Sequence, residues 1–256
     1  MATHPGVTLA LTPNSRWALP FAEVVEATGA AGFSALGVPR AQADRAMADA
    51  FARSGLECHE IVALVMTADS EATVAFAERL ATAAETMGAR WVNTVFPPGP
   101  AVDIGTLRRC AAIFAEVGAG MAVEFSPLGT VTSIAMAREL VATIGHDRAA
   151  VQIDNWHFSF GDSTWADLAD LPLDQIAYVQ FTDAAAPRSD DLMTETLTRR
   201  LLPGDGSLEL ERFATTLLDR GWQGFVSVEV LNDELAAPSV PAFVDRAYAS
   251  SARYWR

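Results

Sequence analysis

The segment VQID at residues 151–154 is a short apolar run with an acidic side chain at its end, and three other segments likewise carry an acid or an amide near their ends. They are MAVEF (121–125), AYVQF (177–181) and FVSVEV (225–230). If the four runs are successive strands of a parallel barrel, the polar residues near their ends meet at one rim. These residues are Glu124, Asp154, Gln180 and Glu229.

Strand-like runs alternate with helix-like segments along the whole chain. The eight runs cover residues 7–11, 33–38, 56–64, 91–95, 121–125, 151–154, 176–181 and 225–230. The Ala-rich segments between them carry apolar residues at helical spacing, and several end at a glycine such as Gly55 or Gly88. This alternation is typical of βα units around a parallel sheet.

Eight such units in 256 residues favour a closed (β/α)8 TIM barrel. The alternative is a doubly wound sheet, which would need a glycine-rich turn after the first strand, where this chain has LALTPNSRW. We therefore expect one TIM-barrel domain over residues 1–256. The long segment 184–207 after the seventh run reads as an irregular loop on the active rim, and long loops of compact domains are often functional.

The composition excludes several classes of function. The chain has 18 basic residues, all of them Arg, so Schiff-base aldolases, pyridoxal phosphate enzymes and P-loop proteins are excluded, because each requires a lysine. A net charge of −14 disfavours binding to nucleic acid or to anionic membranes. Cys58 and Cys110 lack CxxC spacing, and no run approaches the ~20 apolar residues of a membrane span, so we expect a cytoplasmic protein.

Each of the four rim residues alone has an ordinary explanation, such as pairing with an arginine or capping a turn. Their occurrence at the ends of four consecutive strands is harder to explain in that way. Three carboxylates held together repel one another, and a divalent cation removes that cost. Because carboxylate and amide oxygens suit hard ions, the sequence favours Mn²⁺ or Mg²⁺ over Zn²⁺ or Cu²⁺.

The chain resembles the xylose isomerase-like TIM-barrel superfamily of sugar isomerases and epimerases. The resemblance runs through most of the chain and is carried by an ordered set of short motifs. The motifs are VEFSP (123–127), D-x-x-H (Asp154–His157), VQFTDA (179–184), R-x-x-P-G-x-G (Arg200–Gly206) and SVEV (227–230).

The resemblance implies a role for each matching position. Glu124 and Glu229 would be the acid/base pair and would also bind the metal, and Asp154 and Gln180 would complete its shell. His157 would contact substrate oxygens, and Arg200 would position the substrate or the Glu229 side of the site. Most epimerases of this group carry His where this chain has Gln180. Glutamine there is similar to hydroxypyruvate isomerases and to some 3-dehydroshikimate dehydratases.

Other residues near the strand ends are candidates for the pocket. Asn93, where a histidine would be expected from the resemblance, is a possible substrate contact, as is Trp17, for which core packing is an equal alternative. Asp183 is a candidate for orienting a neighbouring side chain. Gly37 stands where an acid is frequent in the superfamily, so the identity of the substrate stays open.

The function expected from these residues is isomerisation or epimerisation of a small polyhydroxylated sugar or keto acid, by proton abstraction next to a carbonyl. The main alternative is a lyase or dehydratase that expels a hydroxyl from the same enolate. A DNA-repair endonuclease of the superfamily is disfavoured, because the chain has only four histidines and no basic stripe. A barrel without catalysis is the third possibility. The aromatic C-terminus, with Tyr254 and Trp255, leaves a homo-oligomer possible.

Overall fold

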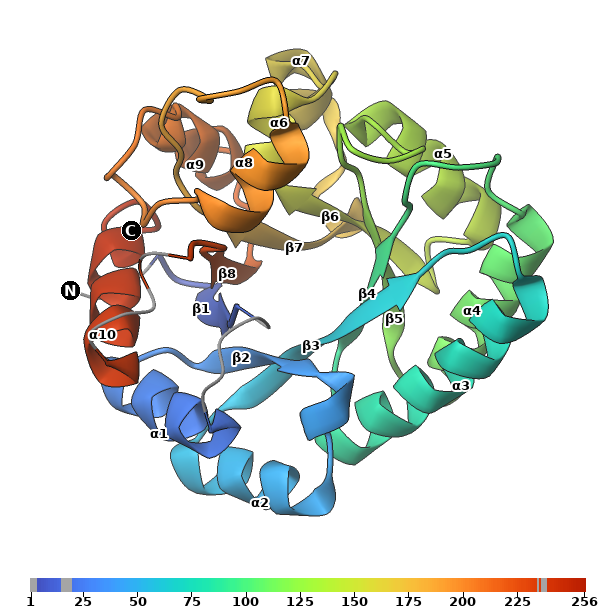
Figure 1. Ribbon diagram of the computed structural model, residues 1–256, viewed down its shortest axis with the longest axis horizontal. Coiled ribbons are helices and arrows are strands. Elements are labelled where there is room, and N and C mark those ends of the chain that lie inside the picture. The colour runs from blue at the N-terminus through green and yellow to red at the C-terminus, as the bar shows by residue number, and fades with distance from the viewer. Residues whose placement is uncertain (1–3, 15–19, 234, 236–238) are drawn as a thin grey trace.

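Eight parallel strands close into a barrel in their order along the chain (Figure 1). The structure is a computed structural model and describes residues 4–14, 20–233, 235 and 239–256. The strands are β1 (Val7–Thr12), β2 (Ala35–Pro39), β3 (Glu57–Val65), β4 (Trp91–Val95), β5 (Gly120–Glu124), β6 (Ala149–Asp154), β7 (Ile176–Phe181) and β8 (Gly224–Glu229). β1 pairs with β8 over six residues, from Val7 opposite Gly224 to Thr12 opposite Glu229, and this pairing closes the barrel.

Most of the helices surround the strands as an outer ring, whereas α8 lies in front of the strands in this view (Figure 1). The helices are α1 (Phe21–Ala31), α2 (Arg45–Ser54), α3 (Ser70–Met87), α4 (Ile104–Glu116), α5 (Ile134–Ile144), α6 (Asn155–Phe160), α7 (Trp165–Asp170), α8 (Leu192–Thr198), α9 (Leu210–Leu218) and α10 (Val240–Ala252). Two short 3₁₀ turns, η1 (Arg40–Gln42) and η2 (Leu173–Gln175), complete the elements. The residues before β1 lie next to those after α10, since the backbone N–H of His4 donates to the carbonyl of Trp255.

The helix boundaries follow from local capping. Asp69 begins α3 by accepting the backbone N–H of Ala72, and Gly88 ends it with a left-handed φ of 62° that a residue with a side chain rarely adopts. Asp103 and Ser133 cap α4 and α5 in the same way. These caps orient each helix so that its apolar face packs on the outside of the barrel, where most of the hydrophobic core lies.

The inside of the barrel is divided into an apolar floor and a polar upper part. Small side chains on β5, β6 and β7 (Ala122, Ala150 and Ala177) form the floor together with Tyr178, and Trp91 and Phe225 pack against it. Above the floor, alternate residues of the strands are polar and buried, because side chains on one face of a strand recur every second residue. The active rim therefore rests on a layer of hydrogen-bonding groups.

The (β/α)8 barrel expected from the sequence is confirmed, and each strand lies within two residues of its expected position. The segment 184–207 differs from the expected irregular loop, because part of it has regular secondary structure. It contains the short helix α8, and an isolated bridge pairs Asp183 with Leu201. Within the described part of the chain, no helix is long and apolar enough to cross a membrane.

Gly37 on β2 gives space to a buried acid on the neighbouring strand. A methyl group added at Gly37 would lie 2.7 Å from Oε1 of Glu60, which is fully buried in the barrel. We predict that Gly37→Ala lowers the free energy of unfolding by about 1–3 kcal/mol, the usual cost of overpacking a core. Urea denaturation followed by circular dichroism measures this change.

The matched control for this prediction is Gly99→Ala. An added methyl group at Gly99 has no heavy atom within 4 Å, and its backbone φ lies outside the left-handed region. We expect this variant to change the stability by no more than about 0.5 kcal/mol. Equal stability of the Gly37→Ala and Gly99→Ala proteins would contradict the close contact with Glu60.

Candidate active site

The four rim residues expected from the sequence lie at the ends of adjacent strands. Asp154 pairs in register with Gln180, and Glu124 lies opposite Gln152, two residues before Asp154 on the same face of β6. Asp154 is fully buried and Gln180 is 3% exposed. The side chains of Glu124 and Glu229 are 13% and 14% exposed to solvent, so these two acids are the ones that face the mouth of the barrel.

Glu124, Asp154 and His157 form a cluster that is able to hold a metal ion. One ligand atom from each lies within 4.8 Å of the others. Nε2 of His157 is 3.1 Å from Oε1 of Glu124 and 3.8 Å from Oδ2 of Asp154. His157 reaches this position because Oδ1 of Asp154 accepts the backbone N–H groups of Trp156 and His157 and so begins α6 at the rim.

Arg200 is buried against two of the rim acids. Its Nη1 donates to Oδ2 of Asp154 at 2.7 Å and to Oε2 of Glu229 at 3.2 Å. Its Nε and Nη2 donate to the hydroxyl of Thr196 on α8, and its Cζ lies 5.5 Å from the centre of the Trp156 ring. The guanidinium therefore supplies part of the positive charge that these carboxylates need.

The two acids that share Arg200 have opposite pKa shifts. Burial raises the pKa of Asp154, but the charge of Arg200, followed by that of His157, outweighs it, so the pKa lies below the ordinary value. Burial raises the pKa of Glu229 well above its usual range, and the charges of Asp154 and Glu124 add to this rise against the opposing effect of Arg200. The two pKa values shift in opposite directions because the guanidinium of Arg200 lies closer to Asp154 than to Glu229.

This donor set fits a divalent cation. Glu124, Asp154 and His157 lie close enough together to share one ion. Gln180 and Glu229 lie near the ends of the next two strands, and Arg200 pairs with Asp154 and Glu229. An acid with its pKa raised by burial and by like charges, as Glu229 has, is a position where added positive charge is favourable. The partly open acids leave room for a ligand on the solvent side.

The segment after β7 is held on the rim by Asp183. Its two carboxylate oxygens accept the backbone N–H groups of Gly204, Gly206 and Leu208, and the residue is 1% exposed. These bonds fix the PGDG turn (203–206), which begins three residues after Arg200. Asp183 thus orders the segment that carries Arg200, and its expected effect on a neighbouring side chain stays a prediction.

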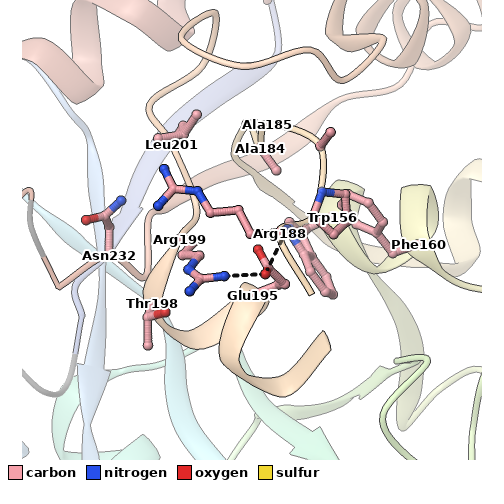
Figure 2. A pocket seen from close by; sticks show the side chains of 12 residues that line it. Trp156, Phe160, Ala184, Ala185, Arg188, Glu195, Thr198, Arg199, Leu201 and Asn232 are labelled. Atoms are coloured by element: carbon pink, nitrogen blue, oxygen red, sulfur yellow. Dashed lines mark hydrogen bonds and ion pairs between the residues drawn. The ribbon is translucent and has the colours of Figure 1, made fainter. Parts of the chain in front are cut away.

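A cavity of about 90 Å³ is lined by residues of α6, of α8 and of the segment that follows β7 (Figure 2). Trp156, whose ring faces Arg200, forms part of its wall. Arg188 and Arg199 also line it, and Arg199 forms an ion pair with Glu195 (Figure 2). The cavity therefore presents two guanidinium groups and one carboxylate next to the active rim.

The other expected site residues have mixed placements. Asn93 is buried, and its Nδ2 donates to Oε2 of Glu124 at 2.7 Å, so its role as a substrate contact stays a prediction. Trp17 lies outside the described residues. The sequence reasoning missed Gln152 and Tyr178, although a signal was present: each lies two residues before a rim residue on the same strand face.

Comparisons with known proteins give one family. The family model described as "Xylose isomerase-like TIM barrel" matches residues 21–255. An inosose isomerase of Halalkalibacterium halodurans is 28% identical over 135 residues, which is 51% of this chain and 46% of that protein. A 3-dehydroshikimate dehydratase of Pseudomonas aeruginosa is 30% identical over 148 residues, 57% of this chain and 23% of that protein. The matched region thus spans about half the length of the inosose isomerase and about a quarter of the length of the dehydratase.

Among solved structures, the IOLI protein with a bound zinc atom superposes with a TM-score of 0.83 at 19% identity, over 96% of this chain and 97% of that one. At this identity the likeness concerns the fold.

We predict that Arg200→Met destabilises the metal-free protein by about 3–5 kcal/mol, because it leaves Asp154 and Glu229 buried without their guanidinium partner. Added Mn²⁺ should raise the melting temperature of this variant more than that of the wild type, since the ion replaces the missing charge. Calorimetry with and without a chelator measures both effects.

The matched control is Arg109→Met, which removes an exposed arginine paired with exposed Glu71. We expect little change in its melting temperature and the same response to Mn²⁺ as in the wild type. If Arg200→Met behaves like this control, then the buried guanidinium does not balance the rim acids.

Proposed function

The chain belongs to the xylose isomerase-like TIM-barrel family, and we propose that it is a divalent-metal-dependent isomerase or epimerase. Its substrate would be a small polyhydroxylated ketone or keto acid. The reaction would begin with removal of a proton next to the carbonyl. The observation that carries this proposal is the pair of partly exposed glutamates, Glu124 and Glu229, on a rim whose other members are buried.

We propose that Glu124, Asp154, Gln180 and Glu229 hold the cation, with His157 next to Glu124. The chemistry that a bound divalent cation supplies here is polarisation of a carbonyl oxygen. The oxygen donors favour Mn²⁺ or Mg²⁺. The nitrogen of His157 in the cluster, together with the zinc in the IOLI protein, makes Zn²⁺ the alternative to be tested.

The two glutamates would move the proton. One carboxylate takes the proton from the carbon next to the carbonyl, which leaves the enolate of the substrate. The other returns a proton to the opposite face of that carbon in an epimerisation. In an isomerisation it would protonate the former carbonyl carbon, while the proton of the neighbouring hydroxyl moves to the former carbonyl oxygen, so that the carbonyl group moves by one carbon. Arg200 would keep the carboxylate of Glu229 in a fixed orientation through its bond to Oε2, so that little reorganisation is needed when substrate binds.

Dehydration is the second candidate function, and a specific observation supports it. Relatives named 3-dehydroshikimate dehydratase match 57% and 39% of this chain at 30% identity. The resemblance noted from the sequence, in which Gln180 is similar to the glutamine of some such enzymes, supports the same function. In this case the enolate would expel a neighbouring hydroxyl group. His157, whose Nε2 lies beside Glu124, would donate the proton with which that group leaves as water.

The cavity beside Trp156 gives a reason to include anionic ketones among the candidate substrates. Arg188 and Arg199 both line it, in a protein whose net charge of −14 otherwise repels anions. A carboxylate on the substrate would interact favourably with these guanidinium groups. Keto acids therefore belong in the substrate panel next to neutral cyclic ketones.

Proton NMR in D₂O separates the two functions. We expect protein loaded with Mn²⁺, Mg²⁺ or Zn²⁺ to act on at least one member of a panel that includes inosose and 3-dehydroshikimate. Replacement of one C–H signal by deuterium indicates an isomerase or epimerase, whereas signals of new C=C protons indicate a dehydratase. Mg²⁺ and Zn²⁺ are diamagnetic and suit direct observation, and Mn²⁺ samples are measured after the ion is removed.

Treatment with a chelator should abolish the reaction, and adding one of the ions back should restore it. Full activity after complete metal removal would contradict the metal dependence. The absence of both exchange and elimination across the whole panel, with every ion, would contradict the proposed reaction type.

We predict that Glu124→Gln and Glu229→Gln each lower kcat at least about 100-fold, because each removes a group that accepts or donates the transferred proton. The matched control is Glu209→Gln, an exposed glutamate paired with Arg212 on α9. Turnover on a verified substrate measures the effect. If both rim variants keep wild-type kcat, the assignment of the acid/base pair is wrong.

A further inference from the structure

The barrel interior beneath the rim is polar where TIM barrels are commonly filled by apolar layers. Burying polar groups costs free energy unless each is hydrogen-bonded, so this layer needs a physical reason. The proposed proton transfers do not use it. Its members are Thr12, Glu60, Asn93, Gln152, Tyr178 and Ser227, each no more than 3% exposed.

Gln152 is the residue of this layer that connects several others. It is fully buried on β6, two residues before Asp154 and on the same face. Its Nε2 donates to Oε1 of Gln180 at 2.6 Å. Its Oε1 accepts from Nδ2 of Asn93 and lies 3.2 Å from the hydroxyl of Tyr178. Gln152 therefore contacts a rim residue directly and reaches a second one through Asn93.

The direction of these hydrogen bonds follows from the charge of Glu124. Its carboxylate can only accept, so Asn93 must present its NH₂ group, which it does at 2.7 Å. The same NH₂ group donates to Oε1 of Gln152, and Gln152 then presents its own NH₂ group to Gln180. The chain of bonds thus ends with an N–H directed at the carbonyl oxygen of Gln180.

Below Gln152, Tyr178 connects it to the buried acid Glu60. Tyr178 donates to Oε2 of Glu60, and Thr12 donates to Oε1 of the same carboxylate. The hydroxyl of Tyr178 thus lies between the carboxylate of Glu60 and Oε1 of Gln152. Because Glu60 and Tyr178 are fully buried and hydrogen-bonded to each other, they restrict the position of the Gln152 side chain.

We propose that Gln152 is a positioning residue that holds the carbonyl oxygen of Gln180 and the carboxylate of Glu124 in a fixed relation, and thereby sets the affinity of the rim for a divalent cation. The inference rests on the proposed function, because it assumes that these two groups hold the ion. Gln152 acts through Gln180 directly and through Asn93 on Glu124.

The test is Mn²⁺ binding to Gln152→Met, which keeps the length of the side chain and removes its donor and its acceptor. Electron paramagnetic resonance of free Mn²⁺ measures the affinity without any substrate. We expect binding about tenfold weaker than in the wild type, which is typical of losing a partner that orients metal ligands. The matched control is Ser227→Ala: Ser227 is equally buried, and its hydroxyl lies 2.6 Å from that of Thr12. It should bind Mn²⁺ within about twofold of the wild type.

A double-mutant cycle shows whether the effect passes through Gln180. In a Gln180→Ala background, Gln152→Met should weaken Mn²⁺ binding by no more than about threefold, because the main contact is already absent. The same tenfold loss in both backgrounds would mean that the effect of Gln152 does not pass through Gln180 and would overturn the inference. So would wild-type affinity in Gln152→Met.

A measurement on the wild type keeps the inference testable if Gln152→Met fails to fold. The side-chain NH₂ signals of Gln152 should be protected from exchange with D₂O and should shift when Mg²⁺ is added. Free exchange, or no shift at saturating Mg²⁺, would overturn the inference. If the folded wild type binds none of Mn²⁺, Mg²⁺ and Zn²⁺, the proposed function itself fails; if it binds one of them and only Gln152→Met or these signals disagree, the inference alone fails.

Discussion

The bond from Arg200 to Asp154 and Glu229 is the interaction on which the rim depends. Without a compensating charge, acids gathered at the ends of neighbouring strands would repel one another strongly in a partly dry site. The guanidinium is held from the other side by Thr196 on α8, and the turn that follows is fixed by Asp183. The segment after β7 is therefore part of the site, because it delivers the positive charge that lets the acids converge.

Much of the fold and part of the site were predictable from the sequence. Short apolar runs separated by capped helices, such as α3 between Asp69 and Gly88, predict the strands and their parallel order. The convergence of Glu124, Asp154, Gln180 and Glu229 follows from that order alone, because parallel strands end at one rim. The position of His157 beside Glu124 depends on the turn capped by Asp154, which the pattern of residues suggested but did not require.

What the sequence did not reveal depends on side chains that cross the barrel. Glu60 on β3 reaches Thr12 on β1 and Tyr178 on β7, and the space for it comes from Gly37 on β2. None of these pairings has a sequence spacing that could identify it, since the contacts join residues up to 118 positions apart. The same holds for Asn93, whose amide is directed at Glu124 rather than at the solvent.

Asp154 has two structural duties on its two oxygens. Oδ1 begins α6 by accepting the N–H groups of Trp156 and His157, and Oδ2 binds Arg200. An asparagine here could still start the helix but would lose the charge, whereas a glutamate would keep the charge but displace the helix start. Both requirements fall on one carboxylate, so the start of the helix that carries His157 and the pairing with Arg200 are mechanically linked through this single side chain.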